Sequence, residues 1–349
     1  MSAVDTPEKS THLALVTTRH GGLEVMQVQQ RPTVPPGAGE VQVRIRAAAF
    51  NHLDLWVRRG EPAGHWPTPI VPCADGAGHV VAVGQGVELP IGTEVAIYPV
   101  ISCHVCERCL AEQPQLCDRF GLLGEHVDGC AQEVVNVSVR DVVELPSGLD
   151  LVVAAAMPTT FITAWQMLHS RAQVQAGQRV VVHGPGSGVG SAAIQLARVL
   201  GAEVIATIRK DADEALARDL GASEVFRNDD PQWPRLVRKM GGADLVFEHV
   251  GAATWQASIK ALKRGGKIVT CGATTGFEVS LNLRKLFFHS ISLLGSTMGT
   301  RSDLKTVIEY AARGLCKPHI GARFPLTKGA QAMGVLERRE VQGKVLIEM

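Results

Sequence analysis

The sequence predicts an α/β protein that combines a β-rich domain with a parallel, doubly wound sheet of six strands. Three observations predict it. Residues 12–146 read as short strands separated by turns, residues 177–295 alternate apolar strands with helices, and a glycine-rich turn joins the first of those strands to its helix. Strand–helix alternation favours a parallel sheet.

The first region has the pattern of an antiparallel sheet. Val41–Arg46 alternates apolar and polar residues, as a half-buried strand does. Further strands are expected at Val80–Val83 and Glu94–Tyr98, and turns at 35–37 and 61–64. A cysteine-bearing loop follows the third of these strands, so we expect it to be an insertion in this domain.

The second region supplies the parallel sheet. Residues 151–168 are helix-like and interrupted at Pro158. A further helix is expected at 302–313, followed by a tail, 343–349, that should rejoin the first domain. The six strands are expected at 179–183, 204–208, 224–226, 245–250, 267–272 and 292–295.

These patterns divide the chain into two domains. Residues 1–158 and 299–349 are expected to form the catalytic domain, and residues 159–298 the dinucleotide-binding domain. The 349 residues are enough for two domains of ordinary size.

Composition argues against several classes of partner. There are 35 basic and 34 acidic residues, so no charge bias favours nucleic acid or an anionic membrane. No apolar run approaches the ~20 residues of a membrane span. The first residues are polar and lack the apolar core of a signal peptide. We expect a cytoplasmic protein that acts on a small molecule.

Four cysteines lie in a fifteen-residue window, CHVCERCLAEQPQLC. Two-residue gaps let a turn direct successive thiolates to one centre, and the longer gap brings the fourth back. Four thiolates with no open position suit one structural zinc ion; the alternatives are disulfides or chance. The expected ligands are Cys103, Cys106, Cys109 and Cys117.

The glycine-rich turn predicts a dinucleotide site. GPGSGVG lies between the apolar strand RVVVH and the helix VGSAAIQLARVL. Glycines there allow a tight turn and let backbone N–H groups approach a pyrophosphate at the helix N-terminus. The alternative is a glycine-rich connector of another α/β fold. The expected contacts are Gly184, Gly186, Ser187, Gly188, Val189 and Gly190.

The second strand of the parallel sheet favours NADPH over NADH. NAD-binding sheets usually end this strand with a carboxylate that binds the ribose 2′-OH. Here the strand Val204–Ile208 is followed by Arg209 and Lys210, which suit a 2′-phosphate. Asp211 is close enough to leave NADH possible.

The chain resembles the medium-chain dehydrogenase/reductase superfamily of zinc alcohol dehydrogenases and quinone oxidoreductases. The resemblance implies a GroES-like catalytic domain, a Rossmann domain, an active site between them, and a structural zinc in a lobe at about 100–120. It rests on the cysteine window and the glycine turn together with PGAGEVQVRIRAAAFNHLD (36–54), DGAGHVVAVGQGV (75–87) and GKVLIE (343–348).

The same resemblance implies that the catalytic zinc has been lost. The family's cysteine, histidine and cysteine ligands match Asn51, Ala74 and Thr159, and its proton-relaying hydroxyl matches Leu53. An amide and a methyl group are poor substitutes for zinc ligands. The alternative is a rebuilt metal site drawn from His52, Asp54, Asp75, His79 or His126.

Other roles are also implied by the resemblance. His52 is expected near the cofactor pyrophosphate, and Thr163 with Val189 against the nicotinamide. Further cofactor contacts are expected from Thr159, Gly272, Ala273, Ser296, Thr297 and Lys344. Asn51 and Asp54 would orient the acceptor or the ribose. His126 is the expected proton donor, with a pKa suited to the task. Each residue has a plain alternative as a packed or solvated side chain.

Without zinc there is no Lewis acid to generate an alkoxide near neutral pH. We therefore expect NADPH-dependent hydride transfer to a quinone or an α,β-unsaturated carbonyl or enoyl compound. Many zinc-free relatives carry a tyrosine where this chain has Trp56. The alternatives are an alcohol dehydrogenase with a rearranged zinc, and a dinucleotide-binding protein without turnover.

The last strand of the parallel sheet suggests self-association. Ile291–Met298 is apolar and is expected at a sheet edge, which invites pairing with another copy. In the superfamily this edge joins two Rossmann domains. We expect a homodimer or homotetramer.

Overall fold

The computed structural model describes residues 11–61 and 66–349, and it contains the expected parallel sheet. The six strands are ordered β12-β11-β10-β13-β14-β15 and every pairing is parallel. The strands are β10 (Arg179–His183), β11 (Glu203–Ile208), β12 (Glu224–Arg227), β13 (Ala243–Glu248), β14 (Leu262–Thr270) and β15 (Ser292–Gly295). The predicted doubly wound α/β class is confirmed.

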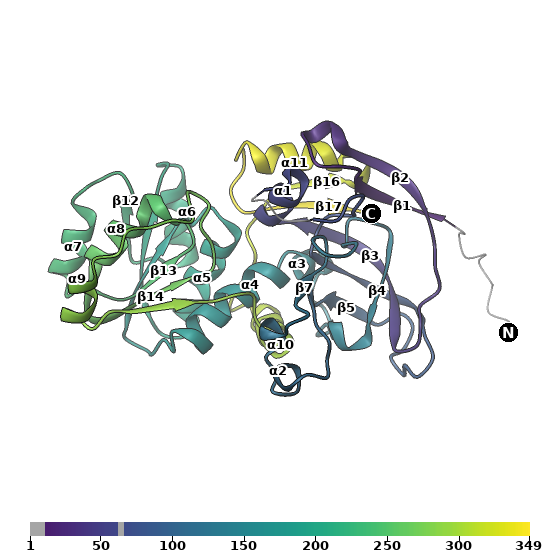
Figure 1. Ribbon diagram of the computed structural model, residues 1–349, viewed down its shortest axis with the longest axis horizontal. Helices are drawn as coiled ribbons and strands as arrows, with labels where there is room; N and C mark the ends of the chain where they lie inside the picture. The colour runs from purple at the N-terminus through teal and green to yellow at the C-terminus, as the bar shows by residue number, and fades with distance from the viewer. Residues whose placement is uncertain (1–10, 62–65) are drawn as a thin grey trace.

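The second large sheet has seven strands and combines distant parts of the chain (Figure 1). Its order is β16-β17-β3-β4-β5-β9, with β8 also paired to β3. The strands are β3 (Glu40–Phe50), β4 (Asp75–Val83), β5 (Glu94–Ile97), β8 (Val134–Ser138), β9 (Val142–Glu144), β16 (Ile320–Pro325) and β17 (Lys344–Glu348). Because β17 pairs with β3, the tail rejoins the first region as expected.

Smaller elements complete this domain. β1 (Thr11–Thr17) pairs with β2 (Met26–Pro32), and β6 (Val100–Ile101) with β7 (Gly121–Leu122) at the base of the cysteine lobe. Helices α1 (His52–Arg59) and α11 (Gly329–Glu337) lie near each other and flank the β17 side of the sheet (Figure 1). The expected turn at 61–64 falls mostly outside the described residues.

One strand begins earlier than expected. β4 starts at Asp75 rather than Val80, because glycines allow the backbone to approach β3 where side chains could not. A Cβ on Gly78 would lie 1.9 Å from the carbonyl oxygen of Arg44. These glycines interrupt the apolar alternation that would have indicated a strand.

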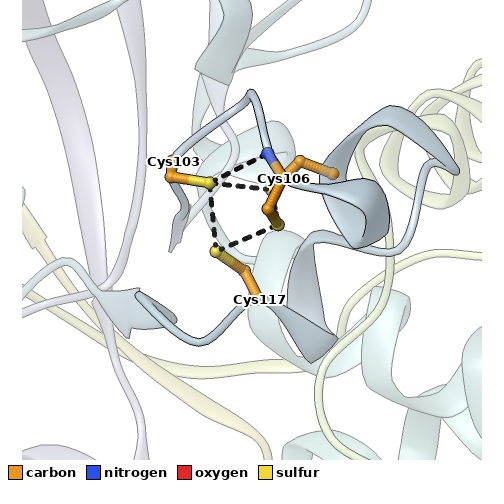
Figure 2. A group of neighbouring side chains, drawn as sticks. Cys103, Cys106 and Cys117 are labelled. Carbon is orange, nitrogen blue, oxygen red and sulfur yellow. Dashed lines mark hydrogen bonds between the residues drawn. The ribbon is translucent and has the colours of Figure 1, made fainter.

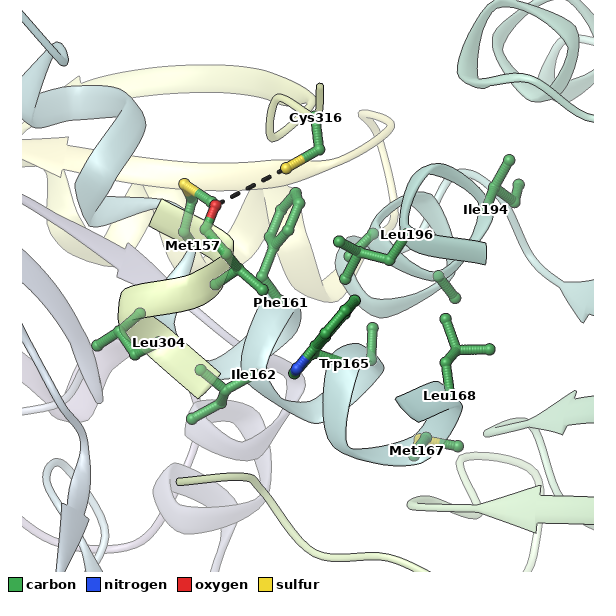
Figure 3. Packing of buried hydrophobic residues seen from close by; sticks show 14 of the residues in the cluster. Met157, Phe161, Ile162, Trp165, Met167, Leu168, Ile194, Leu196, Leu304 and Cys316 are labelled. Atoms are coloured by element: carbon green, nitrogen blue, oxygen red, sulfur yellow. Dashed lines mark hydrogen bonds between the residues drawn. The ribbon is translucent and has the colours of Figure 1, made fainter. Parts of the chain in front are cut away.

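The domains meet around a helical core. α3 (Leu151–Ala155) ends before Pro158, which begins α4 (Pro158–Trp165) at a position where proline is favoured. Figure 3 shows Phe161 of α4 facing Leu196 of α5 (Gly188–Val199), with Leu304 of α10 (Arg301–Ala312) nearby. All three are almost fully buried. Full burial of one such side chain contributes about 1.5–3 kcal/mol, so this core holds α4 against α5 and α10. Among the described residues no helix is long and apolar enough to span a membrane.

Candidate active site and zinc lobe

The glycine turn has the geometry of a pyrophosphate site. β10 ends at His183, Gly184 has φ +62°, and the twelve-residue helix α5 begins at Gly188. Ser187 Oγ accepts a hydrogen bond from Gly190 N at 2.9 Å. A Cβ on Gly190 would lie 2.2 Å from the carbonyl oxygen of Gly184, so that position requires glycine. The helix N-terminus therefore presents backbone donors and a positive dipole to an anion.

A cleft of about 290 Å³ lies between α1, the end of α11 and the segment that follows β14. Its lining includes His52, Arg59 and Arg339, but also Glu337, which forms an ion pair with Arg59. Burial, with Arg339 and Arg59, lowers the pKa of His52. His52 therefore lines a cleft together with Arg339, and its expected place near the cofactor pyrophosphate stays a prediction. Arg339 was not predicted, since nothing in its local sequence relates it to α1.

The segment that follows β15, where the nicotinamide is expected, has one buried polar atom without a hydrogen-bond partner among the described residues. This atom is Ser296 Oγ. Thr163 is 5% exposed and its hydroxyl lies 3.8 Å from Met298 Sδ, so Thr163 is close to the same segment. An orphaned hydroxyl after β15 suits a carboxamide group. Gly272, Ala273, Thr297 and Val189 are placed around this edge of the sheet by β14, β15 and α5.

The end of β11, where the adenosine ribose is expected, carries exposed cations. Arg209 and Lys210 follow β11 and are exposed to solvent. The carboxylate of Asp211 is paired with Arg227. The acidic residue that complicated the choice between NADH and NADPH is therefore already bound to an arginine.

A second polar network lies under the glycine turn and was not predicted. His183 and Glu248 are both fully buried, 3.4 Å apart. His183 Nδ1 lies 2.6 Å from Thr207 Oγ1, and Ser258 Oγ donates to Glu248 Oε2 at 2.9 Å. Glu248 also accepts from the Gly251 amide at 3.0 Å. The network ties the ends of β10, β11 and β13 together at the edge where the turn begins.

Two of the three expected zinc-ligand positions, Asn51 and Thr159, belong to a hydrogen-bonded cluster around Asp75. Asn51 Nδ2 donates to Asp75 Oδ2 at 2.9 Å, and Thr159 Oγ1 donates to Asp75 Oδ1 at 2.6 Å. Lys344 Nζ completes the cluster, donating to Asp75 Oδ2 at 2.8 Å and to Asn51 Oδ1 at 2.6 Å. Asp75 is 0% and Lys344 4% exposed. We call these four residues the Asp75 cluster.

The Asp75 cluster changes the expected role of two residues. The ammonium group of Lys344 donates to Asp75 and Asn51, whereas the expected partner was a cofactor phosphate. The side chain still passes close to the glycine turn, since a Cβ built on Gly188 would lie 3.1 Å from Lys344 Cδ. Thr159 likewise gives its hydroxyl proton to Asp75. The third ligand position, Ala74, is buried and has no donor atom to offer. Two of the three positions are thus bound to one carboxylate.

Asp54 supports the cluster from α1. Its carboxylate accepts hydrogen bonds from the amides of Asn51 at 2.7 Å and Cys73 at 2.8 Å. Burial raises the pKa of Asp54 to about 6, against the opposing effect of those amides and of Lys344. Asp54 thereby connects the start of α1 to the residues before β4.

The candidates for a rebuilt metal site do not converge. Across residues 11–61 and 66–349, the only group of three or more histidine, cysteine or acidic side chains near enough to share an ion is the cysteine cluster. His79 pairs instead with Glu94 at 3.4 Å, with both side chains more than 40% exposed.

His126 differs from the expected proton donor. Its Nδ1 accepts a hydrogen bond from Leu122 N at 3.2 Å, and burial lowers its pKa. Its side chain is 44% exposed. A neutral imidazole with one nitrogen engaged is a weak acid.

The four cysteines form a compact thiol cluster, of which Figure 2 shows Cys103, Cys106 and Cys117. Their neighbouring Sγ atoms are 3.5 to 3.8 Å apart. Four sulfurs at about 2.3 Å from one zinc would be separated by about 3.8 Å, so the cluster fits a tetrahedral ion. Amides of Val105 and Cys106 lower the pKa of the Cys103 thiol to about 6, which favours thiolate.

Comparisons with known proteins agree with this fold. Residues 37–147 match the alcohol dehydrogenase GroES-like domain, and residues 188–313 the zinc-binding dehydrogenase family. An alcohol dehydrogenase of Geobacillus stearothermophilus is 30% identical over 337 residues, covering 94% of this chain and 96% of that protein. The crotonyl-CoA carboxylase/reductase of Cereibacter sphaeroides is 30% identical over 354 residues, covering 91% and 82%.

A solved structure of an NAD-dependent alcohol dehydrogenase is 42% identical, with a TM-score of 0.93, and covers 97% of this chain and 99% of that one. This chain therefore belongs to the zinc-type alcohol dehydrogenase family within the medium-chain dehydrogenases/reductases, and it is an NAD(P)H-dependent oxidoreductase.

Proposed function

We propose that the protein transfers hydride from NADPH to an activated acceptor, a quinone or an α,β-unsaturated carbonyl or enoyl compound, without a catalytic zinc. The observation that carries the proposal is the Asp75 cluster. A buried ion pair with two further hydrogen bonds occupies the place where zinc ligands are expected. An acceptor already polarised by conjugation needs no Lewis acid.

The bound cofactor would supply hydride, and the residues of the chain would position the reactants. The glycine turn would hold the pyrophosphate, with His52 and Arg339 as further candidates, and Ser296 would hold the carboxamide. Exposed Arg209 and Lys210 support NADPH, because Asp211 is paired with Arg227. Holding the reactants in register accounts for much of the rate that such a site can provide.

The relatives support both the proposal and its rival. The similarity to a crotonyl-CoA carboxylase/reductase favours an enoyl acceptor. The similarity to a structure named an alcohol dehydrogenase favours alcohol oxidation with a rearranged zinc. The Asp75 cluster weighs against the second, because recruiting Asn51 and Thr159 to a metal would leave Asp75 and Lys344 with fewer partners.

A zinc count combined with a substrate screen tests the proposal. We expect one zinc per chain, held by the cysteines, and NADPH oxidation with quinones or enoyl thioesters but not with simple aldehydes. Replacing Arg209 and Lys210 together with alanine should raise KM for NADPH more than for NADH. Two zinc ions per chain with turnover of secondary alcohols would contradict the proposal.

We also propose that the protein associates through its parallel sheet. β15 is the edge strand, and the segment before it exposes Leu283, Phe287 and Phe288 at 65%, 67% and 56%. An open edge beside exposed aromatic side chains favours a second copy as the partner. Sedimentation of Phe287→Asp against the unmodified protein tests this, and an unchanged mass would contradict it.

A further inference from the structure

The proposed reaction with an α,β-unsaturated carbonyl acceptor needs a proton donor, and the residues around the Asp75 cluster do not supply one. Hydride addition to a conjugated carbonyl produces an enolate, which needs a proton. Leu53 and Trp56 carry no acidic proton. Lys344 is engaged with Asp75, and giving up its proton would leave a buried carboxylate unpaired, which is costly. His126 is neutral at the relevant pH, since its pKa is lowered.

The residue beside His126 has a different environment. Glu125 lies in a turn held by hydrogen bonds from Gly124 N to Val127 O at 2.8 Å and from His126 N to Leu122 O at 2.9 Å. The turn presses against the segment before β4. A Cβ on Gly124, which has φ +74°, would lie 2.9 Å from Cys73 N.

That contact places Glu125 in the neighbourhood of the Asp75 cluster. The amide of Cys73 donates to Asp54, and Asp54 in turn holds the amide of Asn51. Asp54 is near enough for its charge to act on Glu125. The groups facing Glu125 are thus Asp54 of α1, the Cys73 segment and the adjacent His126.

The Glu125 carboxyl is buried with little to stabilise a charge. Its side chain is 9% exposed, and its nearest potential cation, His126 Nδ1, is 3.9 Å away. Among the described residues no hydrogen bond reaches its oxygens. Burial, and to a lesser extent Asp54, raises the pKa of Glu125 to about 7. A carboxyl with this pKa is about half protonated at pH 7 and mostly protonated at pH 6, unlike an ordinary glutamate.

We propose that Glu125 is the general acid that protonates the enolate. The role rests on the proposed function. Hydride from the reduced nicotinamide forms a C–H bond at the β-carbon, and the π electrons of the C=C bond move toward the carbonyl oxygen. The O–H bond of Glu125 then breaks as its proton forms the second C–H bond at the α-carbon. The resulting carboxylate regains a proton from water on its exposed side.

The test compares two acceptors in one variant. Reduction of crotonyl-CoA requires a C–H bond to be made from an acid, whereas the oxygens of a reduced naphthoquinone take protons directly from water. We expect Glu125→Gln to lower kcat with crotonyl-CoA by about 10²–10⁴-fold and kcat with 1,4-naphthoquinone by less than about threefold. Glu125→Asp should recover part of the loss. Unmodified protein should lose crotonyl-CoA turnover as pH rises through about 7, and this limb should vanish in Glu125→Gln.

A second measurement, which does not depend on catalytic turnover, detects the proton on Glu125 directly. Infrared difference spectra of the unmodified protein against Glu125→Gln should show a protonated carboxyl at pH near 6 that disappears as pH rises. Its absence would overturn the role, as would full activity of Glu125→Gln with crotonyl-CoA. Equal losses with both acceptors would indicate a structural residue and also overturn it. Unmodified protein that reduces neither acceptor would instead contradict the proposed function, and the acid role with it.

Discussion

The cysteine lobe and the Asp75 cluster are the two places where zinc dehydrogenases are expected to hold metal, and they differ in chemistry. The lobe brings four soft sulfur donors to within 3.5 to 3.8 Å of their neighbours. The cluster offers an amide, a hydroxyl and a carboxylate already bound to an ammonium. Because the two sites share no ligands, the donor atoms of one can change while those of the other are kept.

Removing a thiolate should have the largest effect. We expect Cys103→Ser to abolish zinc binding and to cost the lobe roughly 5 kcal/mol or more of stability, since a structural site couples metal affinity to folding. Elemental analysis and thermal unfolding provide the measurement. Cys271→Ser, whose thiol lies outside the cluster, is the matched control and should keep its zinc. If Cys103→Ser kept its zinc, the cysteine lobe would not be the zinc site, and the expected difference between the lobe and the Asp75 cluster would be contradicted.

Breaking the ion pair between Lys344 and Asp75 should have the second-largest effect on stability. We expect Lys344→Met to lower the free energy of unfolding by about 3–5 kcal/mol, because it leaves Asp75 charged and buried. Urea unfolding measures this. Adding Asp75→Asn should restore much of the stability and leave the zinc count unchanged. A loss below about 1 kcal/mol in the single variant would mean that the pair does not hold the cluster together.

Acidification should stabilise the neighbourhood of the cluster through Asp54. The pKa of Asp54 is raised in the folded state to about 6. The folded protein thus binds this proton more tightly than the unfolded chain, and the contribution of Asp54 to stability falls as pH rises from about 4 to 6, by at most about 3 kcal/mol. Urea unfolding of Asp54→Asn should lack this slope. The exposed control Asp219→Asn should retain it, and a slope unchanged in Asp54→Asn would refute the assignment.

The smallest effect should come from one hydroxyl. Thr159→Val removes the hydrogen bond to Asp75 Oδ1 but leaves the one from the Thr159 amide, at 2.7 Å. We expect a loss of about 1.5–3 kcal/mol, the usual range for a hydrogen bond to a charged group. Thr306→Val, at a half-buried position of α10 where the hydroxyl donates only to the carbonyl of Ser302, should change stability by less than about 0.5 kcal/mol. Equal effects in the two variants would show that the Thr159 hydroxyl is dispensable.

The sequence predicted the parts of this molecule whose signals are local. Cysteine spacing predicted the thiol cluster, and Gly184–Gly190 between a strand and a helix predicted the cofactor turn. The Asp75 cluster could be predicted from the sequence only in part. The sequence shows that the zinc ligands are missing, but Lys344 and Asp75 are 269 positions apart and only β17 pairing with β3 brings them together. The His183–Glu248 pair and the burial of Glu125 likewise depend on packing between distant segments.

The position of β17 affects how the chain must fold during synthesis. β17 lies between β16 and β3, within the sheet that the first half of the chain begins. Translation therefore yields β3 and β4 long before the strand that completes their sheet, while all the strands of the parallel sheet emerge together. Domains generally fold as units as they leave the ribosome. The parallel-sheet domain can therefore assemble first. The ion pair between Asp75 and Lys344 can form only after Lys344 has been synthesised.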